Sequence, residues 1–152
     1  MHSTIPTMAH LPRQLATMVE HAGEAALDRA PEGAWPARTI LAHLRDEEAY
    51  VFRLRVERML GEDEPEFTPY PPEVWLAERQ TDRDGTRELL RDFALQRQAS
   101  VNLLERVSET DQHRRGHHPV HGMFTIASWV DYWSKHDREH YFQLERVLHG
   151  QP

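Results

Sequence analysis

The chain contains no cysteine, which excludes disulfides, thiolate metal sites and a thiol nucleophile supplied by the protein. It also lacks an excess of positive charge: the formal net charge is −7 at pH 7, whereas nucleic-acid binding normally needs basic residues to replace phosphate counterions. No apolar run approaches the roughly 20 residues of a membrane-spanning helix, and the stretch MHSTIPTMAHLPRQ contains no apolar segment of signal-peptide length. We therefore expect a cytoplasmic protein without nucleic-acid or membrane partners.

What the chain has in abundance is histidine, with eleven among 152 residues. The length suits a single domain, residues 1–152, that buries its own core. At this frequency of histidine, chance alone supplies about one pair spaced four residues apart. A His-x-x-x-His spacing therefore needs support from its position in the fold before it indicates a metal site.

Apolar residues recur at three- and four-residue spacing along four segments, which predicts four helices. The expected helices are Leu11–Arg29, Pro36–Leu60, Gly85–Val107 and Phe124–Leu148. Leu54 is expected on the buried arc of the second, and Thr125 is expected to be the N-cap of the last. The pattern predicts an all-α four-helix bundle.

The connection Gly61–Asp84 is too long for a tight turn between helices. Its acidic, proline-rich first half is expected to be irregular, and Pro72–Gln80 is expected to form a short helix. A crossover of this length permits the second and third helices to run parallel.

The next connection, Ser108–Met123, contains four histidines and is expected to be a solvated loop. His136 lies roughly 16 Å along the following helix, so we expect the loop histidines, within 113–121, not to reach it.

Two histidines of the last predicted helix, His136 and His140, lie on its buried arc, one turn apart. His43 lies on the buried arc of the second helix, with Glu47 one turn further on. Three imidazoles facing an apolar core need a shared partner. One divalent cation bound by three neutral imidazoles satisfies them and leaves a coordination position open for water or substrate. The alternative is a core histidine, His43, whose hydrogen bond is made by Glu47.

Glu47 is the best candidate for a general base or for a second-shell partner of a ligating imidazole. Other polar and aromatic residues on the inward arcs are candidates for the lining of a substrate pocket, although they equally suit core positions. These are Tyr50, Gln96, Ser100, Trp129 and Trp133.

Two other metal-binding helical bundles fit the sequence less well. Ferritin-like di-iron proteins need a pair of Glu-x-x-His motifs, and the chain contains none, with only Asp137-x-x-His140 approaching one. A haem bundle uses one or two axial ligands, so three convergent histidines exceed its needs.

The segments AHLRDEE, GMFTIASWV and HDREH follow one another in an order and separation that resemble the DinB/YfiT-like superfamily of small four-helix-bundle proteins. The resemblance covers essentially the whole chain. It implies a non-sequential helix order with a long crossover between the second and third helices. It also implies ligands at His43, His136 and His140 for a divalent ion such as zinc, nickel or iron, and a homodimer.

Known activities in that superfamily include thiol-dependent transferases and isomerases and metal-dependent hydrolases. We therefore expect a zinc-dependent or related enzyme that transfers a thiol or hydrolyses a small molecule. Because the chain has no cysteine, any thiol must be a low-molecular-weight cofactor. The alternatives are a non-catalytic, metal-stabilised bundle that acts as a stress-response or binding module, and a bundle whose core histidines are simply hydrogen-bonded.

Overall fold

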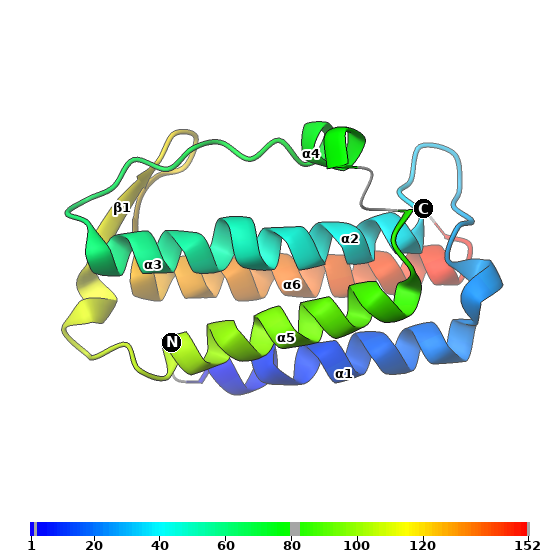
Figure 1. Cartoon of the computed structure of the whole chain (residues 1–152), viewed down its shortest axis with the longest axis horizontal. Coiled ribbons are helices and arrows are strands. Elements are labelled where there is room, and N and C mark those ends of the chain that lie inside the picture. The colour runs from blue at the N-terminus through cyan, green and yellow to red at the C-terminus, as the bar shows by residue number, and fades with distance from the viewer. Residues whose placement is uncertain (2, 80–82, 152) are drawn as a thin grey trace.

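Four long helical segments form the body of the protein in a computed structural model that describes residues 1, 3–79 and 83–151 (Figure 1). The shorter elements are the single turns η1 (Glu24–Ala26) and η4 (Asp111–His113), the helix α4 (Pro72–Arg79) and the strands β1 (Arg115–His118) and β2 (Gly122–Thr125). The long segments are α1 (Ile5–Ala22), the continuous run of α2 (Ala37–Glu47), η2 (Glu48–Arg53) and α3 (Leu54–Gly61), then α5 (Thr86–Leu104) and α6 (Ile126–Leu148). None of the described helices combines the length and the apolar composition needed to cross a lipid bilayer.

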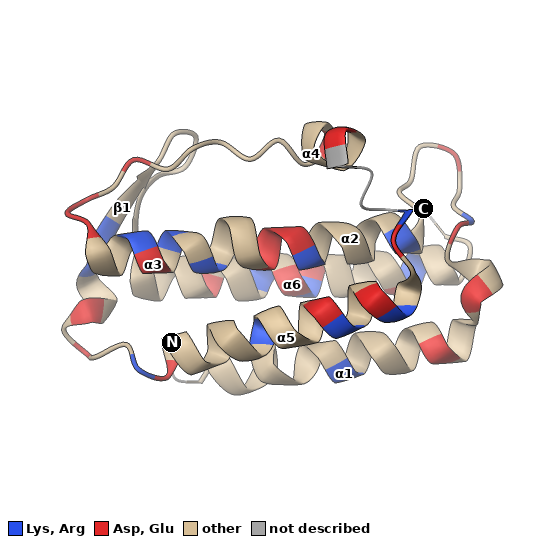
Figure 2. Ribbon diagram, in the orientation of Figure 1, with Lys and Arg blue, Asp and Glu red and all other residues tan. Residues whose placement is uncertain are grey.

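The long helices form a bundle in which α1 and α6 run in one direction and α2–α3 and α5 run in the other (Figure 1). Each of α1 and α2 packs against both α5 and α6. The parallel pair α2 and α5 is joined by residues 62–85, which return along the bundle and include α4 (Pro72–Arg79). This confirms the predicted all-α bundle with a long crossover between the second and third long helices. Figure 2 shows that the crossover begins with an acidic stretch after α3.

The first helix begins earlier and ends earlier than predicted. It begins at Ile5, with a proline in its first turn, and ends before Gly23, whose φ of 78° suits glycine and stops the helix. Pro12 lies inside the helix and has no amide proton, so the carbonyl of Met8 lacks its usual helical partner. Arg97 of α5 donates to that carbonyl at 3.2 Å, which explains how the proline is tolerated.

The second long helix contains a π-helical turn, η2, that the sequence pattern did not reveal. A π turn adds one residue to the helical repeat and rotates the following residues by about 100°. Leu54, predicted to be buried, is therefore 43% exposed, while Arg55 and Val56 face inward. The same turn leaves the adjacent carboxylates Glu47 and Glu48 both buried.

The histidine-rich connection 108–123 is largely exposed, as predicted for a solvated loop, but part of it is a β-hairpin that the sequence did not predict. Strands β1 (Arg115–His118) and β2 (Gly122–Thr125) pair antiparallel, and Gly122 has the positive φ that closes the hairpin. The crossover also joins β1, since Phe67 and His117 are linked through their backbones. Because a Cβ at Gly116 would overlap the ring of Phe67, glycine permits this close approach.

The buried apolar residues form two clusters along the bundle axis. One surrounds Trp129 and Trp133, and the other surrounds Leu15 and Leu144. Between them lies Arg97, which pairs with Glu48 at 2.7 Å and with Asp137 at 2.6 Å. These three charged side chains tie α5, η2 and α6 together inside the core.

Candidate metal centre

Three histidine side chains meet between α2 and α6, as the sequence pattern predicted. The Nε2 atom of His43 lies 3.3 Å from Nε2 of His136 and 3.1 Å from Nε2 of His140. One ring nitrogen from each residue falls within 4.8 Å of the others. His43 comes from α2, and the other two lie one turn apart on α6.

The register of α6 is set at its first turn. Thr125 is its N-cap, as predicted: the backbone N–H of Ser128 donates to the Thr125 hydroxyl at 3.1 Å, and the backbone N–H of Thr125 donates to Ser128 Oγ at 2.9 Å. This reciprocal arrangement satisfies two amide groups that have no helical partner. It places His136 about three turns and His140 about four turns further on, both facing α2.

Glu47 approaches the group through the same nitrogen atoms. Its Oε2 lies 2.7 Å from Nε2 of His136 and 3.4 Å from Nε2 of His43. A second-shell carboxylate would instead contact the other nitrogen, Nδ1, of a ligating imidazole. The carboxylate of Glu47 is therefore placed as a base or as an additional oxygen donor at the centre, and its predicted second-shell role does not fit the geometry.

The outer nitrogens of the three rings differ in their surroundings. Nδ1 of His140 lies 2.6 Å from Oε1 of Gln143, an acceptor, so the Nδ1 proton of His140 is held there and its Nε2 lone pair faces the other rings. The Nδ1 atoms of His43 and His136 are buried without a hydrogen-bond partner among the described residues. Aromatic rings pack against these two imidazoles: the ring centroids of Trp35 and His43 are 5.2 Å apart, and those of Phe52 and His136 are 4.8 Å apart.

Burial keeps the centre in the protonation state that metal binding requires. Burial lowers the pKa of His43 to about 4, and burial with the neighbouring His136 lowers the pKa of His140 to about 4. Burial alone would raise the pKa of Glu47, but the hydrogen bond with His136 and the nearby imidazoles bring it below its usual value. At neutral pH the centre thus offers neutral imidazoles at His43 and His140 beside the ionised carboxylate of Glu47.

The donor set fits a divalent cation. Three imidazole lone pairs directed at one another repel unless a proton or a cation lies between them. A tetrahedral site with metal–nitrogen distances of about 2.0–2.1 Å has nitrogen–nitrogen separations of about 3.3 Å. The separations of 3.1 and 3.3 Å from His43 agree with that value.

A cavity of about 410 Å³ opens beside the three histidines. Five aromatic side chains form much of its wall, and its other polar lining comes from Glu47, Arg55, His118 and His121. The aromatic residues are Trp35, Phe52, Tyr70, Trp129 and Tyr132. The cavity therefore lies under the crossover and the hairpin, and it has the size and apolar character of a small-molecule site.

Of the five predicted pocket residues, only Trp129 lines this cavity. Tyr50 is 47% exposed beside Trp75 of the crossover, and with Gln96 it borders a separate pocket of about 190 Å³. Ser100 is buried and donates to the carbonyl of Gln96. Helix α5 packs against α1 and α2, so its side chains do not reach the cavity on α6.

Trp133 is a core residue. Its ring stacks on Phe52 with centroids 5.1 Å apart, and only 1% of its surface is exposed. Its indole lies one turn before His136 and packs beneath the centre. Trp133 thus supports the wall of the cavity from behind without lining it.

Sequence reasoning missed three polar residues of the cavity. Arg55 faces it because of the π turn, and His118 and His121 reach it because the connection 108–123 folds back as a hairpin. The ring of His121 lies 5.7 Å from that of Tyr132, one turn before His136. No contact joins either hairpin histidine to His136 among the described residues, and neither belongs to the convergent ligand group, as predicted; the sequence did not predict that both line the cavity beside it.

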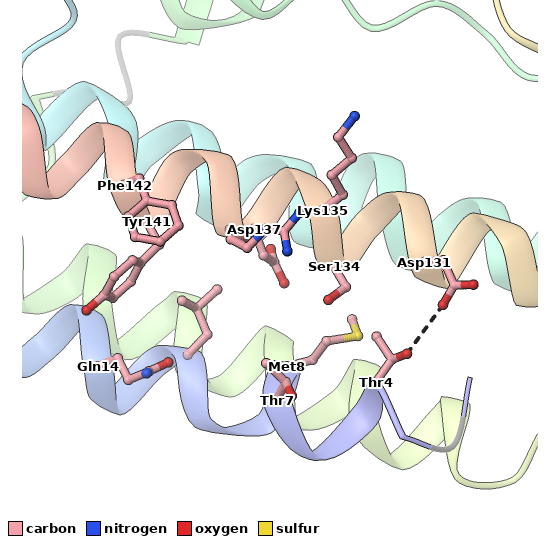
Figure 3. Close-up of a pocket in the computed structure, with 12 residues that line it drawn as sticks. Thr4, Thr7, Met8, Gln14, Asp131, Ser134, Lys135, Asp137, Tyr141 and Phe142 are labelled. Atoms are coloured by element: carbon pink, nitrogen blue, oxygen red, sulfur yellow. Dashed lines mark hydrogen bonds between the residues drawn. The ribbon is translucent and has the colours of Figure 1, made fainter.

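A second cavity, of about 420 Å³, lies between α1 and α6 (Figure 3). Three of its carboxylate and hydroxyl groups, at Asp137, Asp131 and Thr4, have partners: Asp137 accepts from Arg97, and Thr4 donates to Asp131 at 3.3 Å. It contains none of the three histidines. The cavity beside His43 is therefore the stronger candidate for chemistry.

Comparison with known proteins agrees with this architecture. The chain aligns with YfiT from Bacillus subtilis at a TM-score of 0.89 and 20% sequence identity, over 96% of this chain and 84% of that one. That protein is described as a probable metal-dependent hydrolase with an unusual four-helix bundle topology. No curated protein matches the sequence. The sequence profile of the DinB superfamily matches residues 8–144, and the chain therefore belongs to the DinB superfamily.

Proposed function

We propose that the protein is a metal-dependent hydrolase whose divalent cation is held by His43, His136 and His140. The observation that carries the proposal is the convergence of three Nε2 atoms at the edge of an aromatic cavity. Three neutral imidazoles with an open position are a common ligand set of catalytic zinc. Zinc is therefore our first choice of metal, with nickel or iron as alternatives that suit the same ligands.

The chain's own residues supply what hydrolysis needs beside the cation. A bound cation would lower the pKa of a coordinated water to about 7. Glu47, whose Oε2 lies within 3.4 Å of two Nε2 atoms, would act as the base that takes a proton from the attacking water and returns it to the leaving group. The aromatic walls limit competing water and hold the apolar part of the substrate. The metal-dependent hydrolysis attributed to YfiT supports the same choice of reaction.

The role of Glu47 is tested by a Glu47→Gln variant assayed with a panel of small esters and amides. We expect the variant to keep its metal and to lose turnover by about 100-fold or more, the usual contribution of a general base. Glu139→Gln is the matched control, because Glu139 is an exposed carboxylate on α6. Equal turnover in the Glu47 variant and in the unchanged protein would contradict the proposed role.

Transfer of a low-molecular-weight thiol is the second candidate reaction. A cation at this centre would hold an incoming thiol as thiolate, and the cavity of about 410 Å³ is large enough for a small thiol beside an electrophile. Adding thiols and electrophiles to the assay separates the two reactions. Absence of turnover with every substrate, together with tight metal binding, would instead favour a non-catalytic module.

The expected homodimer is tested by the mass of the protein in sedimentation equilibrium.

A further inference from the structure

Arg55 is a buried cation that faces the cavity. It is the second residue of α3, only 6% of its surface is exposed, and it lines the cavity together with Glu47 and the three histidines. The other buried arginine of the described chain, Arg97, is enclosed by two carboxylates. Arg55 has no carboxylate within ion-pair distance among the described residues, so its charge is uncompensated by a direct contact.

The contacts of Arg55 account for only part of its hydrogen-bonding capacity. Its Nη2 donates to the carbonyl of Thr68 at 2.8 Å, and its guanidinium lies 5.2 Å from the ring centroid of Phe67 and 5.0 Å from that of Trp129. A guanidinium carries five N–H donors in a planar fork that matches a carboxylate or a phosphate. Burial lowers the pKa of Arg55 to about 10, partly offset by Glu47, so it is still charged at neutral pH.

A second donor lies near the same end of the cavity. The backbone N–H groups of Val120 and His121 both donate to Nδ1 of His118, at 3.1 and 3.2 Å. The proton of the neutral ring is therefore on Nε2, which makes that atom a donor. Glu47 is the one carboxylate among the residues that line the cavity, and it lies at the three-histidine end.

We propose that Arg55 binds a carboxylate or phosphate group on the substrate, so that the cavity selects small organic anions with an aromatic or otherwise flat apolar body. That the bound anion is a substrate rests on the proposed function, whereas the binding of an anion at Arg55 does not. Arg55 follows Glu47 by eight residues, across the π turn η2, and its contacts are with Thr68 and Trp129 rather than with the three histidines. The anionic group is thus bound at one end of the cavity and the reacting group is held at the other.

A purely structural role for Arg55 is the competing explanation, since its bond to Thr68 also holds the crossover. The chain offers a matched control for that role. Arg58, one turn further along α3, donates to the crossover carbonyl of Glu66 at 2.6 Å and pairs with Glu62 outside the cavity. Arg58→Met therefore removes one positive charge and one crossover bond while leaving the cavity lining intact.

The test measures binding of benzoate, phenyl phosphate and the neutral isostere benzamide to the purified protein by calorimetry. We expect benzoate or phenyl phosphate to bind more tightly than benzamide. Arg55→Met should weaken anion binding at least about tenfold, as expected for loss of a charge-assisted hydrogen bond. Benzamide binding should not change, and Arg58→Met should behave like the unchanged protein. Arg55→Lys, which keeps the charge, should still prefer the anion.

Two results would overturn the proposal. Benzamide could bind as tightly as both anions, or Arg55→Met and Arg58→Met could weaken anion binding equally. The first comparison uses the unchanged protein and so does not depend on the folding of any variant. Metal content measured on the same samples separates this inference from the proposed function. If the protein is metal-free but binds anions through Arg55, the hydrolase proposal alone is wrong. If it contains metal but Arg55→Met does not weaken anion binding, this inference alone is wrong.

Discussion

Glu47 and its three histidine neighbours show how burial and mutual contacts together can prepare a site for a cation. The imidazoles are shielded by Trp35 and Phe52 on one side and face Glu47 on the other. Water would satisfy such rings in solution, but burial removes it. The cost of keeping these groups apart from water is offset when one cation binds all of them.

The low pKa values of His43 and His140 make the stability of the metal-free protein depend on pH. Both values fall from the ordinary 6.5 to about 4. Between these limits the unfolded chain binds protons that the folded chain does not, so the free energy of unfolding falls as the pH falls from 6.5 to 4. Urea denaturation in the presence of a chelator measures this slope.

Replacing one of the buried rings provides the control for the pH dependence. His43→Gln should flatten the slope, whereas His21→Gln, at an exposed position, should leave it unchanged. A free energy of unfolding that stays constant from pH 6.5 to 4 would contradict the assignment of neutral buried imidazoles.

At the scale of elements, the π turn η2 organises the site. Its first residue, Glu48, binds Arg97 of α5, and Arg97 also binds Asp137, the neighbour of His136 on α6. The ion cluster therefore fixes the two backbone segments that present Glu47 and His136. Arg97 does not touch the cavity of the three histidines, so we regard it as a positioning residue.

Removing Arg97 should destabilise the protein strongly. Arg97→Met leaves Glu48 and Asp137 buried without their cation, which typically costs about 3–5 kcal/mol. Chemical denaturation measures the loss. The triple variant Arg97→Met, Glu48→Gln, Asp137→Asn removes the charges together and should recover a large part of it. A loss below about 1 kcal/mol for Arg97→Met would show that the cluster does not stabilise the fold.

Helical periodicity predicted much of the architecture because the bundle buries one face of each long helix. The four helices, the crossover with its short helix and the N-cap at Thr125 all follow from local pattern and turn chemistry. The π turn did not, because it changes the phase of a helix without a signal in residue type. Leu54 was therefore placed inward, whereas the structure exposes it and buries Arg55 instead.

The same contrast holds for the site. The residues of the centre were identified from their helical faces because no π turn disturbs the pattern around them. His43 and Glu47 precede η2 on the second long helix, and His136 and His140 lie on α6. The histidines of the hairpin were not, because their approach depends on the pairing of β1 with β2 and with the crossover. Gln96 and Ser100 were misplaced because periodicity shows that a face is buried but not which helix covers it.

At the scale of the whole molecule, the crossover topology brings α2 beside α6, so that distant parts of the chain supply the three histidines of the proposed metal site. Binding at that junction should stabilise the entire bundle. A chelator should lower the unfolding temperature by roughly 10 °C if the metal is present at about a thousand times its dissociation constant. Calorimetry with and without chelator measures the change. An identical unfolding temperature in both scans, with metal removal verified, would contradict a structural contribution of the ion.

The most direct test of the central claim is the metal content of protein purified without a histidine tag, chelator or added metal. Elemental analysis by mass spectrometry should find about one divalent metal ion per chain, the amount that a single three-histidine site would hold. The ion should be lost in His136→Ala and retained in His149→Ala, whose imidazole is exposed near the end of α6. A folded, metal-free protein that takes up no divalent ion when one is supplied would contradict the claim.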